Sequence, residues 1–315
     1  MRGHVRTHMK AITFDRYGNP DVLRLTEQPE PKVGPGEVLV RVRSASVNPV
    51  DWKIVAGYLD GLMNVQFPAI PGWDVAGVVE RVGLDTPEFA AGDEVIAYAR
   101  KDWVAGGTYA ELVTVAVRGL ARKPKALDWD QAAGLPLAGL TAYQLLNRLS
   151  VKQGDTLLIH AAAGGVGILA VQIAKALGAR VIGTASQSNH DALRSFGAEP
   201  VAYGEGLAGR VRALAPEGVD VVADFIGGVL QTTLAVLKAG GRHGSVVDGE
   251  VAGSGGIYAW VRPNSADLQA LADLADSGTL TVPIAQRFPL TAAAEAFRAS
   301  QSGHVRGKIA IEVSR

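Results

Sequence analysis

The sequence predicts an α/β protein that combines a β-rich unit with a doubly wound parallel sheet. A strand, a glycine-rich turn, a helix and a second strand follow one another in residues 156–186. Residues 10–125 contain short apolar or alternating runs separated by Gly, Pro, Asn and Asp, as in a small barrel or sandwich. After residue 186, strand patterns alternate with helical patterns, which is typical of a parallel sheet covered by helices.

Residues 156–186 read TLLIHAAAGGVGILAVQIAKALGARVIGTAS and form one βαβ unit, because parallel strands need such a crossover. Glycine in the turn lets the backbone approach a pyrophosphate, and the start of the helix favours negative charge. The turn predicted to bind a dinucleotide comprises Ala163, Gly164, Gly165, Val166 and Gly167. Gly167 is expected to let the helix pack closely on the strand. Ala162 replaces the first glycine of the usual G-x-G-x-x-G motif, so a turn that binds nothing is the alternative.

The remaining elements follow from apolar periodicity and turn residues. In the β-rich part, strands are predicted at residues 11–14, 37–44, 75–82, 94–97 and 109–117. A helix is predicted over residues 129–149, interrupted near 134–136. Further helices are predicted at 191–196, 206–214, 229–238, 265–277 and 291–300, and strands at 199–203, 219–225, 242–247 and 308–313. Thr291 is expected to cap the last helix, and residues 248–256 to form a loop at the far edge of the sheet.

Composition excludes several classes of function. The 315 residues are enough for two domains, and Lys+Arg and Asp+Glu both number 31, so no basic excess attracts nucleic acid. The chain contains no cysteine, which excludes disulfides and cysteine–zinc sites and suits a reducing compartment. No apolar run is long enough to span a membrane, and the first residues, MRGHVRTH, lack the apolar core of a signal peptide. We expect a cytoplasmic protein in which residues 1–8 are an extension and poorly ordered.

Nine motifs in order resemble one known family over nearly the whole chain. They are MKAITFDRYGNPDVL (9–23), NPVDWK (48–53), PGWDVAGVV (71–79), GDEV (92–95), GGTYAEL (106–112), LPLAGLTAYQLL (135–146), HAAAGGVG (160–167), FPLTAAAEAF (288–297) and GHVRGK (303–308). The chain resembles the zinc-free quinone oxidoreductase branch of the medium-chain dehydrogenase/reductase (MDR) superfamily. The resemblance implies a GroES-like β-barrel catalytic domain, residues 1–127 and 263–315, with an inserted Rossmann domain, residues 128–262. It also implies hydride transfer from a nicotinamide cofactor, with the substrate in the cleft between the domains.

The same resemblance bears on metal binding. Asn48 stands where zinc enzymes of the superfamily have a cysteine, and Trp73-Asp74 stands where they have a histidine next to a glutamate. The chain has no cysteine, and no two of its six histidines share metal-ligand spacing on a helix. We therefore expect no bound metal, which disfavours alcohol oxidation through a zinc-polarised oxygen.

Five residues are implied at the reaction site, each with a plainer alternative. The Asn48 amide can donate to an oxygen that gains negative charge, or can simply form the turn before a proline. Asp51 lies beside this site in the family, although a structural ion pair is an equal interpretation. Lys53 donates to the oxyanion or is merely solvated. Tyr58 lines the mouth of the substrate pocket or lies in a surface loop, and Trp73 forms an apolar wall for a flat substrate.

The end of the second Rossmann strand predicts NADPH as the cofactor. NAD enzymes of this fold place an acid there to accept hydrogen bonds from the ribose 2′-hydroxyl, whereas this chain has Ser186, whose hydroxyl can donate to a 2′-phosphate. In the alternative, Ser186 only caps the next helix and both cofactors bind. The other residues expected to bind the cofactor are Thr141, Asn189, His190, Arg194, Tyr203 and Lys308. Asp191 is expected to weaken the positive field of Arg194.

The function that these observations favour is NADPH-dependent reduction of a quinone or of an α,β-unsaturated carbonyl (enone), without metal. The alternatives are an NADPH-binding or nucleic-acid-binding protein with weak catalysis, and a zinc-independent alcohol dehydrogenase. Balanced charge disfavours nucleic acid as a partner. A homodimer is expected, because the β-prone run at residues 257–261 follows the last Rossmann strand, and family members pair this edge across a two-fold axis.

Overall fold

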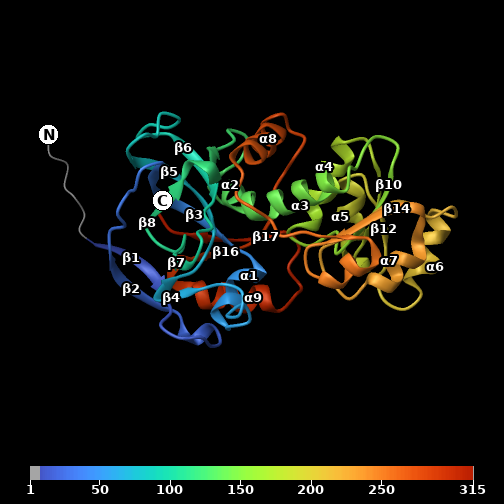
Figure 1. Cartoon of the computed structure of the whole chain (residues 1–315), viewed down its shortest axis with the longest axis horizontal. Coiled ribbons are helices and arrows are strands. Elements are labelled where there is room, and N and C mark those ends of the chain that lie inside the picture. Colours follow the sequence, from blue (N-terminus) through green and yellow to red (C-terminus); the bar gives the residue numbers. More distant parts are fainter. Residues whose placement is uncertain (1–7, 315) are drawn as a thin grey trace. The chain divides into compact units, whose positions relative to one another are not determined.

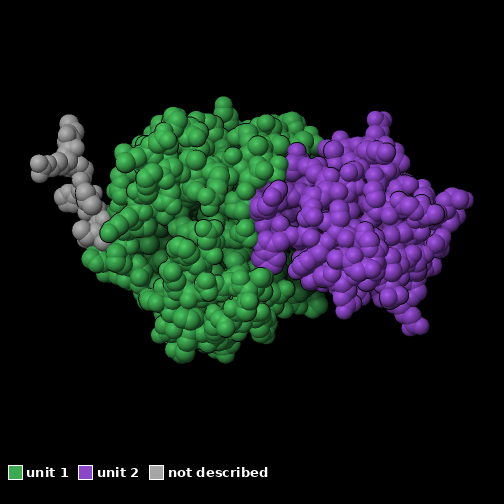
Figure 2. All heavy atoms as spheres, viewed as in Figure 1, with its two compact units in different colours: residues 1–137, 263–315 green, residues 138–262 purple. Residues whose placement is uncertain are grey.

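The computed structural model describes residues 8–314. The expectation of poor order for residues 1–8 therefore lies outside the described residues, except at His8, which instead pairs with Pro29 in a strand. The chain divides into two compact units (Figure 2). Unit 1 comprises residues 1–137 and 263–315, and unit 2 comprises residues 138–262.

Unit 1 is built around a barrel-like sheet that is antiparallel except for the parallel pair β16 and β17 (Figure 1). Its strands are β1 (His8–Thr13), β2 (Arg24–Pro29), β3 (Glu37–Val47), β4 (Val65–Ile70), β5 (Asp74–Val82), β6 (Glu94–Tyr98), β7 (Val104–Gly106), β8 (Leu112–Ala116), β9 (Leu120–Arg122), β16 (Ile284–Pro289) and β17 (Lys308–Glu312). The main sheet has the order β16-β17-β3-β5-β6-β9, and β8 also pairs with β3. Inward-facing valines of β3, β5, β6 and β8 form its core. The C-terminal strand β17 thus completes a sheet that the N-terminal part begins.

The helices of unit 1 alternate with these strands along the chain. They are η1 (Pro20–Val22), α1 (Pro49–Val55), η2 (Val117–Gly119), α2 (Trp129–Gly134), α8 (Ser265–Asp276), η5 (Leu290–Ala292) and α9 (Ala293–Gln301), and α3 (Pro136–Arg148) continues into unit 2. The predicted interruption near residues 134–136 is confirmed. Helix α2 packs on β3 and β5 of unit 1, although the sequence-based division placed it in the second domain. The predicted cap at Thr291 is wrong, because the chain first makes the 3-10 turn η5, and α9 starts without a side-chain cap.

Unit 2 is a doubly wound parallel sheet, as the sequence predicted. Its elements are β10 (Thr156–His160), α4 (Gly167–Ala176), β11 (Arg180–Thr184), η3 (Gln187–Asn189), α5 (His190–Ser195), β12 (Glu199–Val201), α6 (Leu207–Leu214), β13 (Val219–Asp224), α7 (Leu230–Val236), β14 (Leu237–Ser245), η4 (Gly249–Ser254) and β15 (Ile257–Tyr258). The strand order is β12-β11-β10-β13-β14-β15, and all neighbours are parallel. The order reverses at β10, and ligands of such sheets bind at the carboxyl ends of the strands near this reversal.

Several predicted boundaries in unit 2 are shifted, and the largest error lies between α7 and β14. The helix predicted over residues 229–238 ends at Val236, and the strand predicted from residue 242 begins at Leu237. Leu237 already pairs with Val219 of β13, and the ladder then resumes at Arg242 after an irregularity. Gly240, with φ 72°, lies in the interrupted part. Pairing with a neighbouring strand, which the local pattern does not reveal, therefore determines where the helix stops.

Candidate active site

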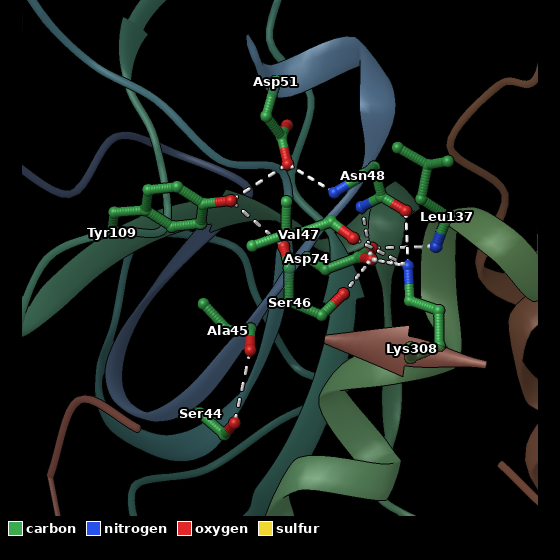
Figure 3. Close-up of polar contacts among 10 residues, drawn as sticks. All are labelled: Ser44, Ala45, Ser46, Val47, Asn48, Asp51, Asp74, Tyr109, Leu137 and Lys308. Atoms are coloured by element: carbon green, nitrogen blue, oxygen red, sulfur yellow. Dashed lines mark hydrogen bonds and ion pairs between the residues drawn. The ribbon is translucent and has the colours of Figure 1, made fainter. Parts of the chain in front are cut away.

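The candidate active site of unit 1 forms where three neighbouring strands begin or end. Asn48 follows the last residue of β3, Asp74 is the first residue of β5, and Lys308 is the first residue of β17. Because β3 lies between β5 and β17 and is antiparallel to both, these three ends meet at one edge of the sheet. Figure 3 shows their side chains converging there. All three side chains are buried, with at most 3% of the residue exposed.

The Asn48 amide is held between two charged groups. Its Nδ2 donates to Asp74 Oδ2 at 2.8 Å, and its Oδ1 accepts from Lys308 Nζ at 2.5 Å. Lys308 Nζ also donates to the Val47 carbonyl at 3.2 Å and lies 3.9 Å from Asp74 Oδ2. The amide cannot be rotated by half a turn without placing its NH2 group against the ammonium and its oxygen against the carboxylate. Its orientation is therefore fixed by charge.

Asp74 is the anion of this network. The Ser46 hydroxyl donates to its Oδ2 at 2.8 Å, and the Leu137 N–H donates to its Oδ1 at 2.8 Å. Burial raises the pKa of Asp74, and burial lowers the pKa of Lys308, whereas the attraction between the two groups opposes both shifts. The pair leaves neither charge isolated in the interior, which is the condition under which buried charges are tolerated.

Asp51 forms a second, adjoining set of contacts. It lies in the first turn of α1, where its Oδ2 accepts from the Asn48 N–H at 2.7 Å and from the Tyr109 hydroxyl at 3.0 Å. Its Oδ1 is buried and has no hydrogen-bond partner among residues 8–314. Burial raises the pKa of Asp51 to about 7, and the nearby charge of Asp74 acts in the same direction. Asp51 is therefore a buried acid that changes charge near neutral pH.

The structure separates the predicted reaction-site residues into two groups. Asn48 and Asp51 lie in the network, and Trp73, 5% exposed, packs edge-on against Tyr98 with ring centroids 5.9 Å apart. Lys53 instead lies over the Trp52 ring with its Nζ 5.6 Å from the ring centroid, and Tyr58 is 72% exposed. Within residues 8–314, neither the Lys53 nor the Tyr58 side chain forms a hydrogen bond with the network around Asn48. The roles of these two residues stay predictions.

Three members of the network were not predicted as site residues: Ser46, Asp74 and Tyr109. Asp74 and Tyr109 belong to motifs that carry the family resemblance, PGWD and GGTY. Those motifs were the available signal for both residues. Ser46 lies in an ordinary alternating strand, so no local pattern marks it. Lys308 was predicted to bind the cofactor. In this structure its ammonium donates to the Val47 carbonyl and to Asn48 Oδ1.

The glycine-rich turn of unit 2 joins β10 to α4. Ala161, with φ 55°, starts the turn, and its N–H donates to Thr184 Oγ1 at 3.0 Å. A Cβ on Gly167 would lie 2.1 Å from the Ala161 carbonyl oxygen, so the close packing predicted for Gly167 is present. Residues 164–166 are partly exposed at the start of the ten-residue helix α4. An open turn at a helix N-terminus suits a pyrophosphate, so these residues fit the expected dinucleotide.

Ser186 lies just past the end of β11 and is partly exposed. Its hydroxyl makes no capping hydrogen bond to η3, so the alternative in which it serves only as a cap lacks that contact. It contacts Ser188 Oγ and Asn189 Nδ2, each at 3.1 Å. The His190 ring nitrogen Nε2 contacts the Ala185 carbonyl at 3.2 Å. The strand end thus presents neutral hydroxyl and amide groups.

The other predicted cofactor residues are dispersed over unit 2. Arg194 pairs with Asp191 at 2.7 Å on the surface, as expected from the neighbouring acid. Tyr203 is 64% exposed, on a loop whose carbonyls accept from the Arg210 guanidinium. Thr141 is buried in α3. Whether these three residues contact a cofactor stays a prediction.

Neither a metal cluster nor a membrane helix is found in residues 8–314. No group of three or more His, Cys, Asp or Glu side chains is placed there to hold a metal ion. Across the same residues, every helix falls short of the length and apolar character required to cross a bilayer.

Comparison with known proteins identifies the family. Residues 34–125 match the alcohol dehydrogenase GroES-like domain, and residues 196–311 match the family described as zinc-binding dehydrogenase. The chain is 33% identical to the mitochondrial NAD(P)H oxidoreductase RTN4IP1 of Homo sapiens, over 98% of this chain and 90% of the relative. It is 34% identical to the chloroplastic NADPH-dependent alkenal/one oxidoreductase of Arabidopsis thaliana, over 96% of this chain and 79% of the relative.

A solved structure agrees with these relatives. The quinone oxidoreductase from Coxiella burnetii superposes with a TM-score of 0.85 at 35% identity, covering 98% of this chain and 100% of that one. The expected combination of a GroES-like domain with a parallel Rossmann sheet is confirmed. The chain belongs to the quinone oxidoreductase branch of the medium-chain dehydrogenase/reductase superfamily.

Proposed function

We propose that this protein is an NADPH-dependent oxidoreductase that transfers hydride to a quinone or to the C=C bond of an enone, without a resident metal. The names of its relatives, an alkenal/one oxidoreductase and a quinone oxidoreductase, support both substrate classes. The observation that carries the proposal is the buried Asn48 amide, a non-titrating donor held between Asp74 and Lys308. Such a donor can stabilise an oxygen that gains negative charge during reduction.

Each unit contributes a separate part of this chemistry. The bound cofactor supplies the hydride. In unit 2, residues 164–167 would hold its pyrophosphate and Ser186 its 2′-phosphate. In unit 1, Asn48 would donate to the carbonyl oxygen of the substrate, and Trp73 would provide an apolar wall.

The test is steady-state oxidation of NADPH with a panel of quinones, enones and aldehydes, and reduction of NADP+ with a panel of alcohols, each with and without a chelator. We expect turnover with quinones or enones that the chelator does not change. Turnover only with alcohols would favour the alcohol dehydrogenase alternative. NADPH binding without turnover would favour a binding protein, and filter binding at low salt would then test nucleic acid as its ligand.

Cofactor preference tests the interpretation of Ser186. Ser186→Asp places a carboxylate where the 2′-phosphate is expected, so the preference for NADPH over NADH should fall by about 1–3 kcal/mol, roughly 5- to 150-fold. Catalytic efficiency with both cofactors measures the shift. The exposed Ser195, on the same segment but at the end of α5, provides the control Ser195→Asp. An equal shift in both variants, or none in Ser186→Asp, would remove Ser186 as the determinant.

We also propose that the protein is a homodimer through β15. Strand β15 pairs with β14 on one side, and no strand of residues 8–314 covers its other edge. Tyr258 and Trp260 beside this edge are 44% and 37% exposed. A dimer by light scattering at micromolar concentration is expected, and Tyr258→Lys should shift it toward monomer. Leu84→Lys, at a 77% exposed site of unit 1, should leave the mass unchanged.

A cytoplasmic location is proposed as well. It rests on the cysteine-free sequence, which suits a reducing compartment. The two relatives described above are named as mitochondrial and chloroplastic, so location differs within the family. Fractionation of the source cells decides it.

A further inference from the structure

The Asn48 amide has one hydrogen that the network does not use. Its Nδ2 carries two hydrogens, and Asp74 accepts only one of them at 2.8 Å. No second acceptor for this nitrogen is present in the described part of the chain. The Oδ1 atom is occupied by Lys308 Nζ at 2.5 Å. The amide is therefore anchored through one N–H and its oxygen, and the second N–H is the group left to meet a ligand.

The ammonium on Oδ1 changes the strength of that second N–H. A cation that donates to an amide oxygen draws electron density from the amide nitrogen, which makes the remaining N–H a better donor. The effect is greatest where water is excluded, and Lys308 is 3% exposed. Asp74, 3.9 Å from Nζ and fully buried, stabilises the charged form of Lys308.

The arrangement also limits where the amide can point. Lys308 is the first residue of β17 and Asp74 is the first residue of β5, so both anchors sit on the sheet instead of on a loop. The close-up in Figure 3 shows Lys308 and Asp74 on the two polar ends of the Asn48 side chain. Removal of either anchor would free the amide to rotate.

We propose that Lys308 is a positioning residue of the reduction, which holds and polarises the Asn48 amide so that its free N–H meets the oxygen that gains negative charge. The inference rests on the proposed function and adds a role to it. It differs from a contact between Lys308 and the cofactor, because Lys308 acts through Asn48. A loss of the Lys308 charge should therefore affect turnover and leave NADPH affinity unchanged.

The experiment compares three variants with the wild type on the quinone and enone panel. Lys308→Gln keeps a donor but removes the charge, and we expect it to lower kcat about 10- to 100-fold with the Kd for NADPH unchanged within about twofold. Lys308→Arg keeps the charge and should restore most of the lost turnover. In a double-mutant cycle, Lys308→Gln added to Asn48→Leu should cost less than about twofold, because its effect passes through the missing amide.

The outcomes separate the inference from the proposed function. A wild type that is inactive on the whole panel contradicts the proposed function and this inference with it. An active wild type contradicts the inference alone if Lys308→Gln retains full turnover, if the two losses multiply in the cycle, or if the Kd for NADPH rises in parallel with the loss of kcat. Should Lys308→Gln not fold, Asp74→Asn/Lys308→Met is measured in its place with the same expected loss, because it leaves no unpaired buried charge.

Discussion

Asn48→Leu is expected to lower kcat for quinone or enone reduction about 100- to 1000-fold, the usual cost of removing one oxyanion donor. The side-chain amide of Asn48 makes the hydrogen bonds to Asp74 and Lys308. Leucine has a similar volume but no hydrogen-bond donor, so the substitution removes the donor and keeps the size of the side chain. Stabilisation of negative charge is lost in the transition state, so turnover should fall more than the binding of NADPH weakens. Steady-state kinetics with saturating cofactor, together with NADPH binding by fluorescence, measure both quantities.

The control for this variant is Asn147→Leu, which makes the same change at an exposed position of α3. It should retain wild-type turnover. Because Asn48→Leu also removes the group between two buried charges, its thermal melting is recorded first. A folded Asn48→Leu protein with unchanged turnover would exclude Asn48 from catalysis, and an equal loss of turnover and NADPH affinity would indicate a structural role.

Asp51→Asn is expected to remove a large pH dependence of stability. Asp51 has a pKa of about 7 in the folded protein, raised from 3.8 mainly by burial. Between these two values the folded state binds a proton that the unfolded state has released, so the free energy of unfolding falls as the pH rises from about 4 to about 7. The loss at pH 7 from this one group is on the order of 4 kcal/mol at 1.36 kcal/mol per unit.

Urea unfolding of the wild type and Asp51→Asn at several pH values between 4 and 8 measures this effect. Asparagine resembles the protonated acid and does not titrate. The free energy of unfolding of the variant should therefore depend less on pH, and it should increase relative to that of the wild type as the pH rises. Asp191→Asn, where the side chain is 97% exposed, is the matched control and should follow the wild-type profile. Parallel profiles for the wild type and Asp51→Asn would show that folding does not raise the pKa of Asp51.

The elements that could be predicted were those with a strong local pattern. The strand, glycine turn and helix of residues 156–176 were found because apolar periodicity and small residues coincide there, and Gly167 is needed for close packing. The alternation that follows predicted the parallel sheet. The errors lie at boundaries, as at Thr291 and Leu237, where a neighbouring strand or an extra turn decides the end of a helix.

The candidate site was predicted only in part. Asn48 and Asp51 were found because NPVDWK resembles a family motif, and the hydrogen bond between them at the start of α1 joins residues that are close along the chain. Asp74 was linked to Asn48 only through the zinc-ligand positions that the resemblance implies, and Tyr109 was quoted within a motif without any link to Asn48. Exposure of Tyr58 also follows from the fold around it and not from its own type.

The sequence by itself determined the two kinds of unit, the glycine-rich turn between strand and helix, the absence of cysteine and the family, because each depends on residues that are close along the chain or on motif order. The tertiary structure alone decided that Lys308 meets Asn48 and Asp74. These residues are up to 260 positions apart along the chain, and they meet because β17 returns to pair with β3 beside β5. Strand pairing of this range is selected by the burial and hydrogen bonding of the whole sheet, and a local pattern cannot specify it.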